Sequence, residues 1–172
     1  MHTMKKITVA LLLLASLTMA ATAKTKKEKS LYDRLGKKPA LTAVVDEFVA
    51  RVAADTRINM KFGKTNIPRL KMMLVDQLCA ATGGPCKYKG RSMTETHKNM
   101  KVTEGEFNAL VEDLVGALDK FKVPDKEKNE LLAILGPLKS QIVEVNSMDT
   151  GTPLPADYKP APPLNAKPKT KM

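Results

Sequence analysis

Apolar residues in this chain recur with the period of an α-helix. In residues 44–52 they fall at i, i+1, i+4, i+5 and i+8, which places them on one stripe of a helix. Comparable stripes follow at residues 70–81, 107–118 and 131–142. No segment alternates apolar and polar residues in the way that a half-buried strand does. The sequence therefore predicts an all-α fold.

Short motifs mark where these helices begin and end. A hydroxyl residue stands three positions before a carboxylate at residues 30–33, 92–95 and 103–106, which is the pattern of a helix-starting capping box. The Gly-Gly-Pro run at 83–85 cannot continue a helix and should end the one before it. Pro137 lacks a backbone N–H, so we expect it to kink the last helix.

The first 23 residues have the form of a secretory signal peptide. Lys5 and Lys6 provide the positive start, an apolar run covers residues 7–17, and small residues follow at 21–23. The alternative is a membrane anchor, but the run is too short to span a bilayer, so no stable membrane insertion is expected. We expect a periplasmic or secreted protein whose mature chain begins near Lys24.

Composition divides the chain into four segments. We expect a signal peptide at 1–23, a basic N-terminal extension at 24–29, one helical domain at 30–147 and a disordered tail at 148–172, where six of the eleven prolines lie. Cleavage of the signal would remove two lysines and no acid, lowering the net charge from +11 to +9.

An exported protein without interleaved aromatic and basic residues is not expected to bind nucleic acid. The basic surface either meets an acidic redox partner or anionic lipid, or simply solubilises the chain ends.

Cys79 and Cys86 are the two cysteines of the chain. An even pair in an oxidising compartment is a disulfide candidate, and the glycines between them allow the chain to turn back. Two free buried thiols are the alternative.

His97 is the one histidine outside the expected signal peptide, and it lies on a short capped helix. A single histidine cannot build a histidine-based metal site, but it can hold a haem iron from one side. The alternative is an ordinary surface or core histidine. No Cys-x-x-Cys-His motif is present, so covalent c-type haem attachment is not indicated.

Several separated motifs, in matching order and spacing, resemble those of the group I truncated haemoglobins. They are the LYDRLG run at 31–36, FVARVAAD at 48–55, GGP at 83–85, YKGR at 88–91, and His97. The resemblance spans about residues 30–145. It implies a truncated globin, in which a two-over-two helical sandwich surrounds one non-covalent haem b, and we expect a monomer.

The resemblance also implies site residues. His97 matches the proximal iron ligand, Phe48 the aromatic residue of the distal pocket, and Phe62 the phenylalanine that stacks on the haem. Tyr88 matches a residue that shapes the loop before the proximal helix. Basic side chains are candidates to meet the haem propionates: Arg91, Lys71 and Lys98.

The sequence departs from the family pattern on the distal side. Val49 stands where a tyrosine commonly donates a hydrogen bond to oxygen, and Leu70 and Leu74 stand where glutamine is common. A polar bound ligand that lacks a charge-assisted hydrogen bond loses about 1.5–3 kcal/mol. The resemblance, with these departures, predicts an apolar distal pocket and argues against tight oxygen storage and oxygen-dependent NO detoxification.

Met73 is a candidate sixth ligand to the iron. It precedes Leu74 on the same helical arc, at a position from which some family members supply an internal ligand. A His/Met pair raises the potential of haem iron, as in electron-transfer cytochromes. The alternative is that Met73 fills a gap in the core.

These observations predict a haem-binding globin whose cofactor-binding residues are His97, Phe48, Phe62, Leu70, Met73, Leu74, Tyr88 and Arg91. It would bind a diatomic ligand (O2, NO or CO), transfer electrons to a redox partner protein, or do both. One alternative is a haem enzyme of the NO dioxygenase or peroxidase type, although peroxidase chemistry needs a polar distal acid–base group. Another is a haem-free helical interaction module in which His97 is incidental.

Overall fold

The computed structural model describes residues 28–160. The expected signal peptide, most of the expected basic extension and the tail beyond residue 160 lie outside this range. The described part contains seven α-helices and two 3₁₀ helices: α1 (Leu31–Arg34), α2 (Lys37–Ala54), η1 (Asn59–Phe62), α3 (Ile67–Ala81), α4 (Met93–His97), α5 (Glu104–Lys120), α6 (Asp125–Leu135), η2 (Gly136–Leu138) and α7 (Lys139–Ile142). Within residues 28–160, no helix combines the length and apolar character needed to cross a membrane.

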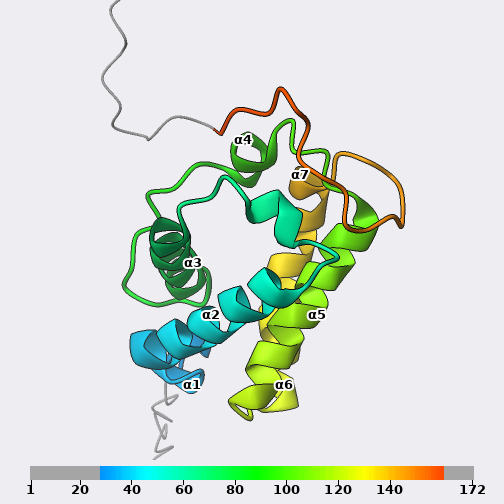
Figure 1. Cartoon of the computed structure of the whole chain (residues 1–172). Helices are drawn as coiled ribbons and strands as arrows, with labels where there is room; N and C mark the ends of the chain where they lie inside the picture. Colours follow the sequence, from blue (N-terminus) through cyan, green and yellow to red (C-terminus); the bar gives the residue numbers. More distant parts are fainter. Residues whose placement is uncertain (1–27, 161–172) are drawn as a thin grey trace, which may run out of the picture.

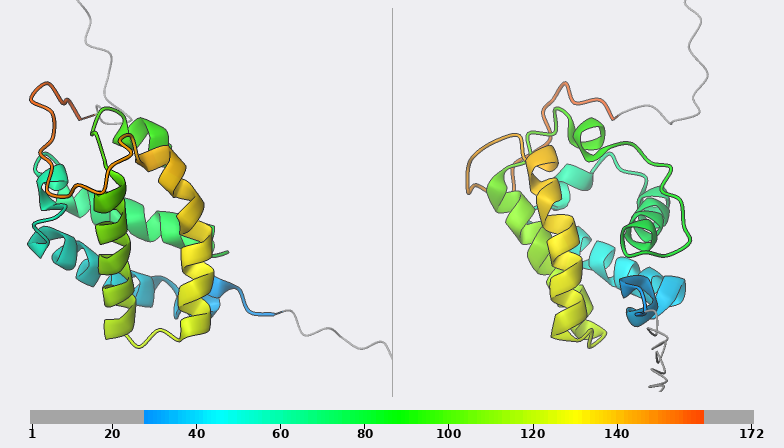
Figure 2. Two further views of the ribbon diagram at one scale, coloured as in Figure 1. Left: turned by 90° about the vertical axis from the view of Figure 1, so that its right-hand side faces the viewer. Right: turned by 180° about the vertical axis from the view of Figure 1, so that it is seen from behind.

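The long helices form two layers, one of α2 and α3 and the other of α5 and α6 (Figure 1). Helix α2 packs against both α3 and α5, so it connects the layers. Helices α5 and α6 run antiparallel and are joined by a short turn, while α4 lies against α7 at the far end (Figures 1 and 2). The only β-type pairing among the described residues is an isolated bridge between Thr103 and Val145. The all-α prediction is confirmed.

The predicted helix starts are present as hydrogen bonds. Ser92 and Thr103 both form complete capping boxes with the glutamate three residues later. Helix α3 ends at Ala81, and Gly83 follows in the left-handed region, with a φ of 84° that suits a residue without Cβ. The predicted disturbance at Pro137 takes the form of η2, which separates α6 from α7.

The main core lies where α2, α3, α5 and α6 meet. Its largest fully buried side chains include Leu118, Leu131 and Val45. A second cluster lies at the α4–α7 end and consists of Met100, Val102, Phe107 and Ile142. The periodicity of the sequence predicts the main core well, because its residues come from long amphipathic helices.

The prediction of a disordered tail from residue 148 is wrong for the described residues. Residues 147–158, here called the C-terminal strap, run across the α4–α7 end of the molecule (Figure 1). Leu154 and Tyr158 pack against the second cluster, and the Thr152 N–H donates to Glu106 Oε1 at 2.9 Å. Composition alone suggested an unpacked segment, whereas a few well-spaced anchors are sufficient to hold it.

Candidate functional site

An apolar cavity of about 240 Å³ lies between the two helical layers and is partly open to solvent. Both layers and the α4–α7 end contribute to its wall. Its lining residues are Val45, Phe48, Leu74, Gln77, Leu78, Met93, His97, Phe107, Leu110, Val111, Leu114, Leu132, Leu135, Gly136, Leu138 and Ile142. Two of these, His97 and Gln77, have nitrogen-bearing side chains, and none is charged by default. The cavity therefore suits a large apolar ligand that is held by one or two polar contacts.

The His97 ring is oriented by its own helix. Its Nδ1 lies 2.8 Å from the backbone oxygen of Met93. A carbonyl oxygen can only accept, so Nδ1 carries the proton in this contact and donates it. In the neutral ring, Nε2 then keeps its lone pair, which is the arrangement that a metal-binding histidine requires.

The surroundings of His97 favour the neutral ring. Burial lowers the pKa of His97, and this effect outweighs the Met93 carbonyl and the Glu144 carboxylate, both of which act to raise the pKa. A neutral imidazole at neutral pH is the form that binds a metal. His97 is therefore both oriented and in the protonation state needed to serve as an axial ligand.

Both ends of α4 are fixed. At its start, the Ser92 side chain accepts from the Glu95 N–H, while Glu95 accepts from the Ser92 N–H. After its end, Glu144 accepts from the backbone N–H groups of Asn99 at 2.7 Å and Lys101 at 2.6 Å. Asn99 and Lys101 both have positive φ, so this carboxylate stabilises an otherwise unfavourable backbone.

A disulfide joins Cys79, near the end of α3, to Cys86 in the loop toward α4, with a Cα–Cα distance of 5.7 Å. The pairing agrees with the sequence interpretation. It ties the segment that carries His97 to α3, which contributes Leu74, Gln77 and Leu78 to the cavity wall.

Of the eight residues expected to bind the cofactor, Phe48, Leu74 and His97 line the cavity. The other five are not among its lining residues: Phe62, Leu70, Met73, Tyr88 and Arg91. Phe62 packs against Val52, Ile58 and Ala109 in a separate small cluster, and Leu70 packs against the main core.

Met73, the candidate sixth ligand, is half-buried but does not line the cavity. The methionine that does is Met93, one helical turn before His97. Tyr88 lies in the loop before α4, where its hydroxyl donates to the Arg91 carbonyl at 2.9 Å. This contact is consistent with a role for Tyr88 in shaping that loop.

Gln77 is the polar lining residue that was not among the expected cofactor-binding residues. Its Nε2 lies 3.7 Å from the Met93 sulfur, a weak acceptor. Helical spacing places Gln77 three residues after Leu74 on the same face, and this signal was sufficient to find it.

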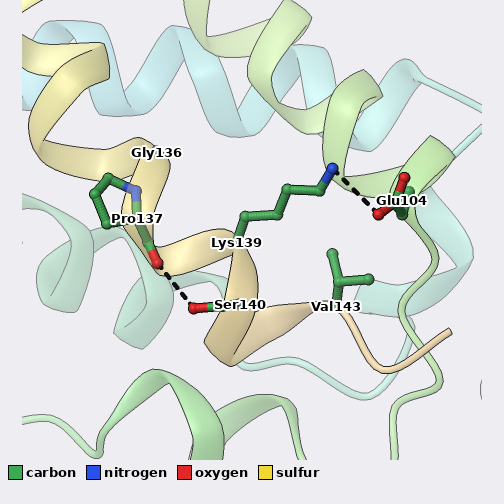
Figure 3. A pocket seen from close by; sticks show the side chains of 6 residues that line it. All are labelled: Glu104, Gly136, Pro137, Lys139, Ser140 and Val143. Carbon is green, nitrogen blue, oxygen red and sulfur yellow. Dashed lines mark hydrogen bonds and ion pairs between the residues drawn. The ribbon is translucent and has the colours of Figure 1, made fainter. Parts of the chain in front are cut away.

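A second, open hollow lies on the outer surface beside η2 (Figure 3). Lys139 forms an ion pair with Glu104 at 3.4 Å across it, and the Ser140 hydroxyl donates to the Pro137 carbonyl at 3.1 Å. These polar groups are paired with one another, so the hollow presents no group that awaits a ligand.

The donor set of the cavity fits a haem. A flat apolar macrocycle needs apolar walls on both faces and one axial nitrogen, and the cavity provides both. Among residues 28–160 there is no cluster of three or more His, Cys, Asp or Glu side chains that could hold a metal ion by themselves. His97 is thus suited to hold a metal whose other ligands come from a macrocycle.

Comparison with known proteins agrees with this geometry. Residues 30–144 match the family of bacterial-like globins. A group 1 truncated haemoglobin of Mycolicibacterium paratuberculosis is 37% identical over 113 residues, which cover 66% of this chain and 83% of that protein. One from Tetrahymena pyriformis is 34% identical over 109 residues, which cover 63% of this chain and 90% of that protein.

Solved structures show the same arrangement. The Fe(III) form of the Tetrahymena pyriformis truncated haemoglobin superimposes with a TM-score of 0.65 at 31% identity, covering 67% of this chain and 98% of that one. A second structure is a 2/2 haemoglobin from a Synechococcus species, in the cyanomet state with covalently attached haem. It gives a TM-score of 0.65 at 29% identity, covering 68% of this chain and 100% of that one. The chain therefore belongs to the bacterial-like globin family and is a haem-binding globin of the truncated haemoglobin type.

Proposed function

We propose that this protein binds haem b without covalent attachment, with His97 Nε2 as the protein ligand to iron, and that it binds a small diatomic ligand on the opposite face. The observation that carries the proposal is the His97 ring itself. It stands at the wall of an apolar cavity, with Nδ1 committed to the Met93 carbonyl at 2.8 Å. When bound, haem supplies an iron centre that takes gases reversibly and changes oxidation state.

Non-covalent binding is supported by the lack of a spare nucleophile. Both cysteines of the chain form the disulfide. His97 is the only histidine among residues 28–160, and the proposal uses it for iron. Within that range, neither a cysteine nor a histidine is left to attach the macrocycle.

The proposed ligand is NO or CO in preference to O2. Phe48 and Leu74 line the cavity from the α2–α3 side and offer no hydrogen bond. Oxygen bound to iron becomes polar and gains most from a donor, whereas CO and NO depend on one less. Apart from His97, the Gln77 amide is the one side-chain donor in the wall, and it lies beside Met93.

Axial ligation by His97 and Met73, with electron transfer to a partner protein, is the second candidate. It is supported by the position of Met73 on α3, directly before Leu74, which lines the cavity. A ferrous spectrum distinguishes the two. Ligation by Met73 would give a six-coordinate low-spin species that becomes five-coordinate in Met73→Leu.

The decisive test of His97 is substitution with rescue. His97→Gly should bind haemin weakly and lose the iron–histidine vibration in resonance Raman spectra. Added imidazole should restore that band, because it can occupy the space left by the side chain. An unchanged Raman spectrum in His97→Gly would exclude His97 as the ligand.

We also propose that the protein acts in an oxidising compartment, the periplasm or the extracellular space. The Cys79–Cys86 disulfide supports this, because such bonds persist where thiols are not kept reduced. Mass spectrometry of the protein from its native host should find a mature N-terminus near Lys24. A chain that retains residues 1–23 would contradict export by signal cleavage.

A further inference from the structure

Two opposite charges are buried together at the α4–α7 end. Lys61 on η1 is 4% exposed, and Glu106 in the first turn of α5 is 2% exposed. Their Nζ and Oε2 atoms lie 3.5 Å apart. Lysine and glutamate are almost never buried this deeply unless they are paired, so the contact holds both in place.

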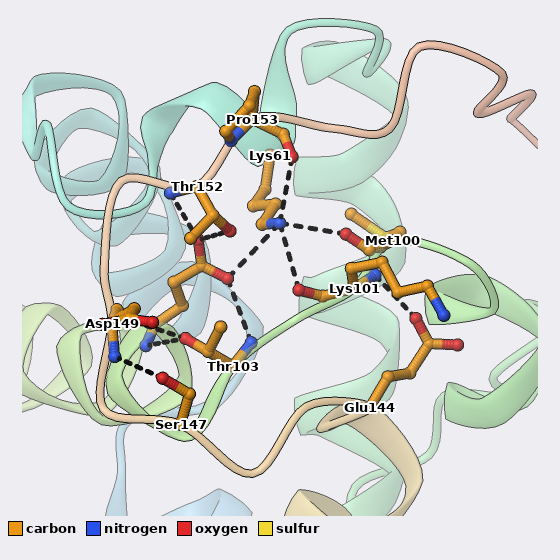
Figure 4. A network of polar contacts seen from close by, with 10 residues as sticks. Lys61, Met100, Lys101, Thr103, Glu144, Ser147, Asp149, Thr152 and Pro153 are labelled. Atoms are coloured by element: carbon orange, nitrogen blue, oxygen red, sulfur yellow. Dashed lines mark hydrogen bonds and ion pairs between the residues drawn. The ribbon is translucent and has the colours of Figure 1, made fainter.

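Lys61 joins two segments that are distant in sequence. Its ammonium group donates to the backbone carbonyls of Met100 at 2.9 Å and Lys101 at 3.2 Å, in the loop that follows His97. It also donates to the carbonyl of Pro153 at 3.4 Å, in the C-terminal strap (Figure 4). One side chain thus fixes the strap to the loop after His97.

Glu106 completes the connection from α5. Its Oε1 accepts from the Thr152 N–H at 2.9 Å and from the Thr152 hydroxyl at 2.6 Å. Its Oε2 accepts from the Thr103 N–H at 3.1 Å, and the Thr103 hydroxyl donates to the Asp149 carbonyl at 2.6 Å. Both carboxylate oxygens are therefore in use, and two of the contacts hold the strap.

The strap also reaches the cavity wall. Leu154 and Tyr158 pack against the second cluster. Two members of that cluster, Phe107 and Ile142, line the cavity as well. The second cluster therefore contacts the strap and also contributes two side chains to the space proposed for haem.

We propose that the C-terminal strap is part of the haem site: it retains haem by packing against the second cluster, which supplies Phe107 and Ile142 to the cavity wall, and the Lys61–Glu106 pair holds it in place. This inference rests on the proposed function. Loss of haem from a globin requires that water reach the iron–histidine bond and that the apolar wall open. A locked strap opposes both, because it packs against the cluster that supplies part of the wall and because it immobilises the loop after His97.

The test is haem transfer to an excess of apomyoglobin, followed by absorption at neutral pH. Two truncations form a matched pair: removal of residues 161–172 leaves the strap, whereas removal of residues 148–172 deletes nearly all of it. The longer deletion should accelerate haem loss on the order of tenfold or more, since it leaves Glu106 and Lys61 without several partners. The shorter deletion should match the full chain.

Point variants test the lock itself. Lys61→Met should also speed haem loss on the order of tenfold, because it leaves a buried carboxylate unpaired. Thr152→Val removes one hydroxyl donor and should have a milder effect, roughly two- to tenfold. Lys126→Met, an exposed lysine at the start of α6, serves as the control and should change nothing.

Hydrogen exchange of the haem-free protein gives a second readout. The amides of Gly151 and Thr152 donate to Arg57 and Glu106 in the locked strap. Lys61→Met should abolish their protection while the amides of α2 remain protected, which also shows that the variant is folded.

The outcomes are distinguishable. If the full chain takes up haemin but loses it no slower than the 148–172 deletion, the strap inference is overturned and the proposed function stands. If the full chain takes up no haemin, the proposed function is overturned and the inference with it. Faster loss in both the longer deletion and Lys61→Met supports the inference.

Discussion

Glu106 and Phe107 are neighbours on α5, yet they belong to two contrasting regions. Phe107 lines an apolar cavity whose wall leaves one histidine nitrogen without a protein partner. Glu106 belongs to a polar cluster in which both carboxylate oxygens accept hydrogen bonds from the protein. The first region is built to receive something, and the second is already complete. The available histidine nitrogen, rather than polarity as such, distinguishes the first region from the second.

The largest expected effect on stability comes from removing one partner of the buried Lys61–Glu106 pair. Lys61→Met should lower the free energy of unfolding by about 3–5 kcal/mol, since it leaves the buried Glu106 charge without its counter-ion. Urea denaturation of the haem-free protein measures this. Lys126→Met should stay within about 0.5 kcal/mol of the parent. A loss of under about 1 kcal/mol in Lys61→Met would show that the pair is not the fastening described here.

The disulfide fastens the other end of the segment that carries His97. Replacing both Cys79 and Cys86 by serine should cost about 2.5 kcal/mol of stability in the chain-entropy model, less than the loss of Lys61. The same denaturation experiment on the parent with a thiol reductant should reproduce the shift. A larger cost for the cysteine variant than for Lys61→Met would reverse the ranking of the two fastenings.

The apolar region can be tested by giving it a donor. Leu74→Gln should slow O2 dissociation from the ferrous protein by about tenfold, because an added charge-assisted hydrogen bond contributes at least about 1.5 kcal/mol. CO dissociation should change little. Leu74→Met, which has similar volume and no donor, is the control, and flash photolysis or stopped flow gives the rates. An equal effect of both substitutions would assign the change to shape rather than hydrogen bonding.

The smallest effect concerns Asp113, an incomplete counterpart of Glu106 on the same helix. Its Oδ2 is buried without a hydrogen-bond partner. Burial raises the pKa of Asp113, with repulsion from Asp55 adding to it and Arg57 opposing it. The folded state thus binds this proton more tightly than the unfolded state, so the charge costs stability at neutral pH and the cost disappears as pH falls below the raised pKa.

Asp113→Asn should therefore raise the free energy of unfolding at pH 7 by about 0.5 kcal/mol or less, because the group is partly exposed to solvent. The gain should shrink in unfolding curves recorded at progressively lower pH. A gain that grows on acidification would contradict the assigned cause.

The helices and main core were predictable from sequence because their information is local. Capping at Ser92 and Thr103, the stop at Gly83 and the break at Pro137 each depend on residues within a few positions of one another. The tether between Cys79 and Cys86 is local in the same sense. These features agree with the structure.

The polar cluster was not predictable in this way. Lys61 lies 45 residues before Glu106 in the printed sequence, and nothing in either neighbourhood distinguishes it from the many solvated lysines. The tail was misjudged for the same reason, since its composition hides the few residues that anchor it. The resemblance located His97, Phe48 and Leu74 correctly on the cavity wall. It also pointed to Met73 as a candidate ligand, but Met73 is not among the lining residues, because one step along a helix turns a side chain by about 100° from Leu74.

Helix α4 has five residues, too few to be stable as an isolated helix. The hydrogen bonds at its two ends, from the Ser92–Glu95 capping box and from Glu144, must therefore stabilise it. Segments of this kind open as small cooperative units at a free energy below that of global unfolding. The element that presents the histidine is thus expected to open locally before the whole molecule unfolds, and such an opening would give a flat ring a way into the cavity.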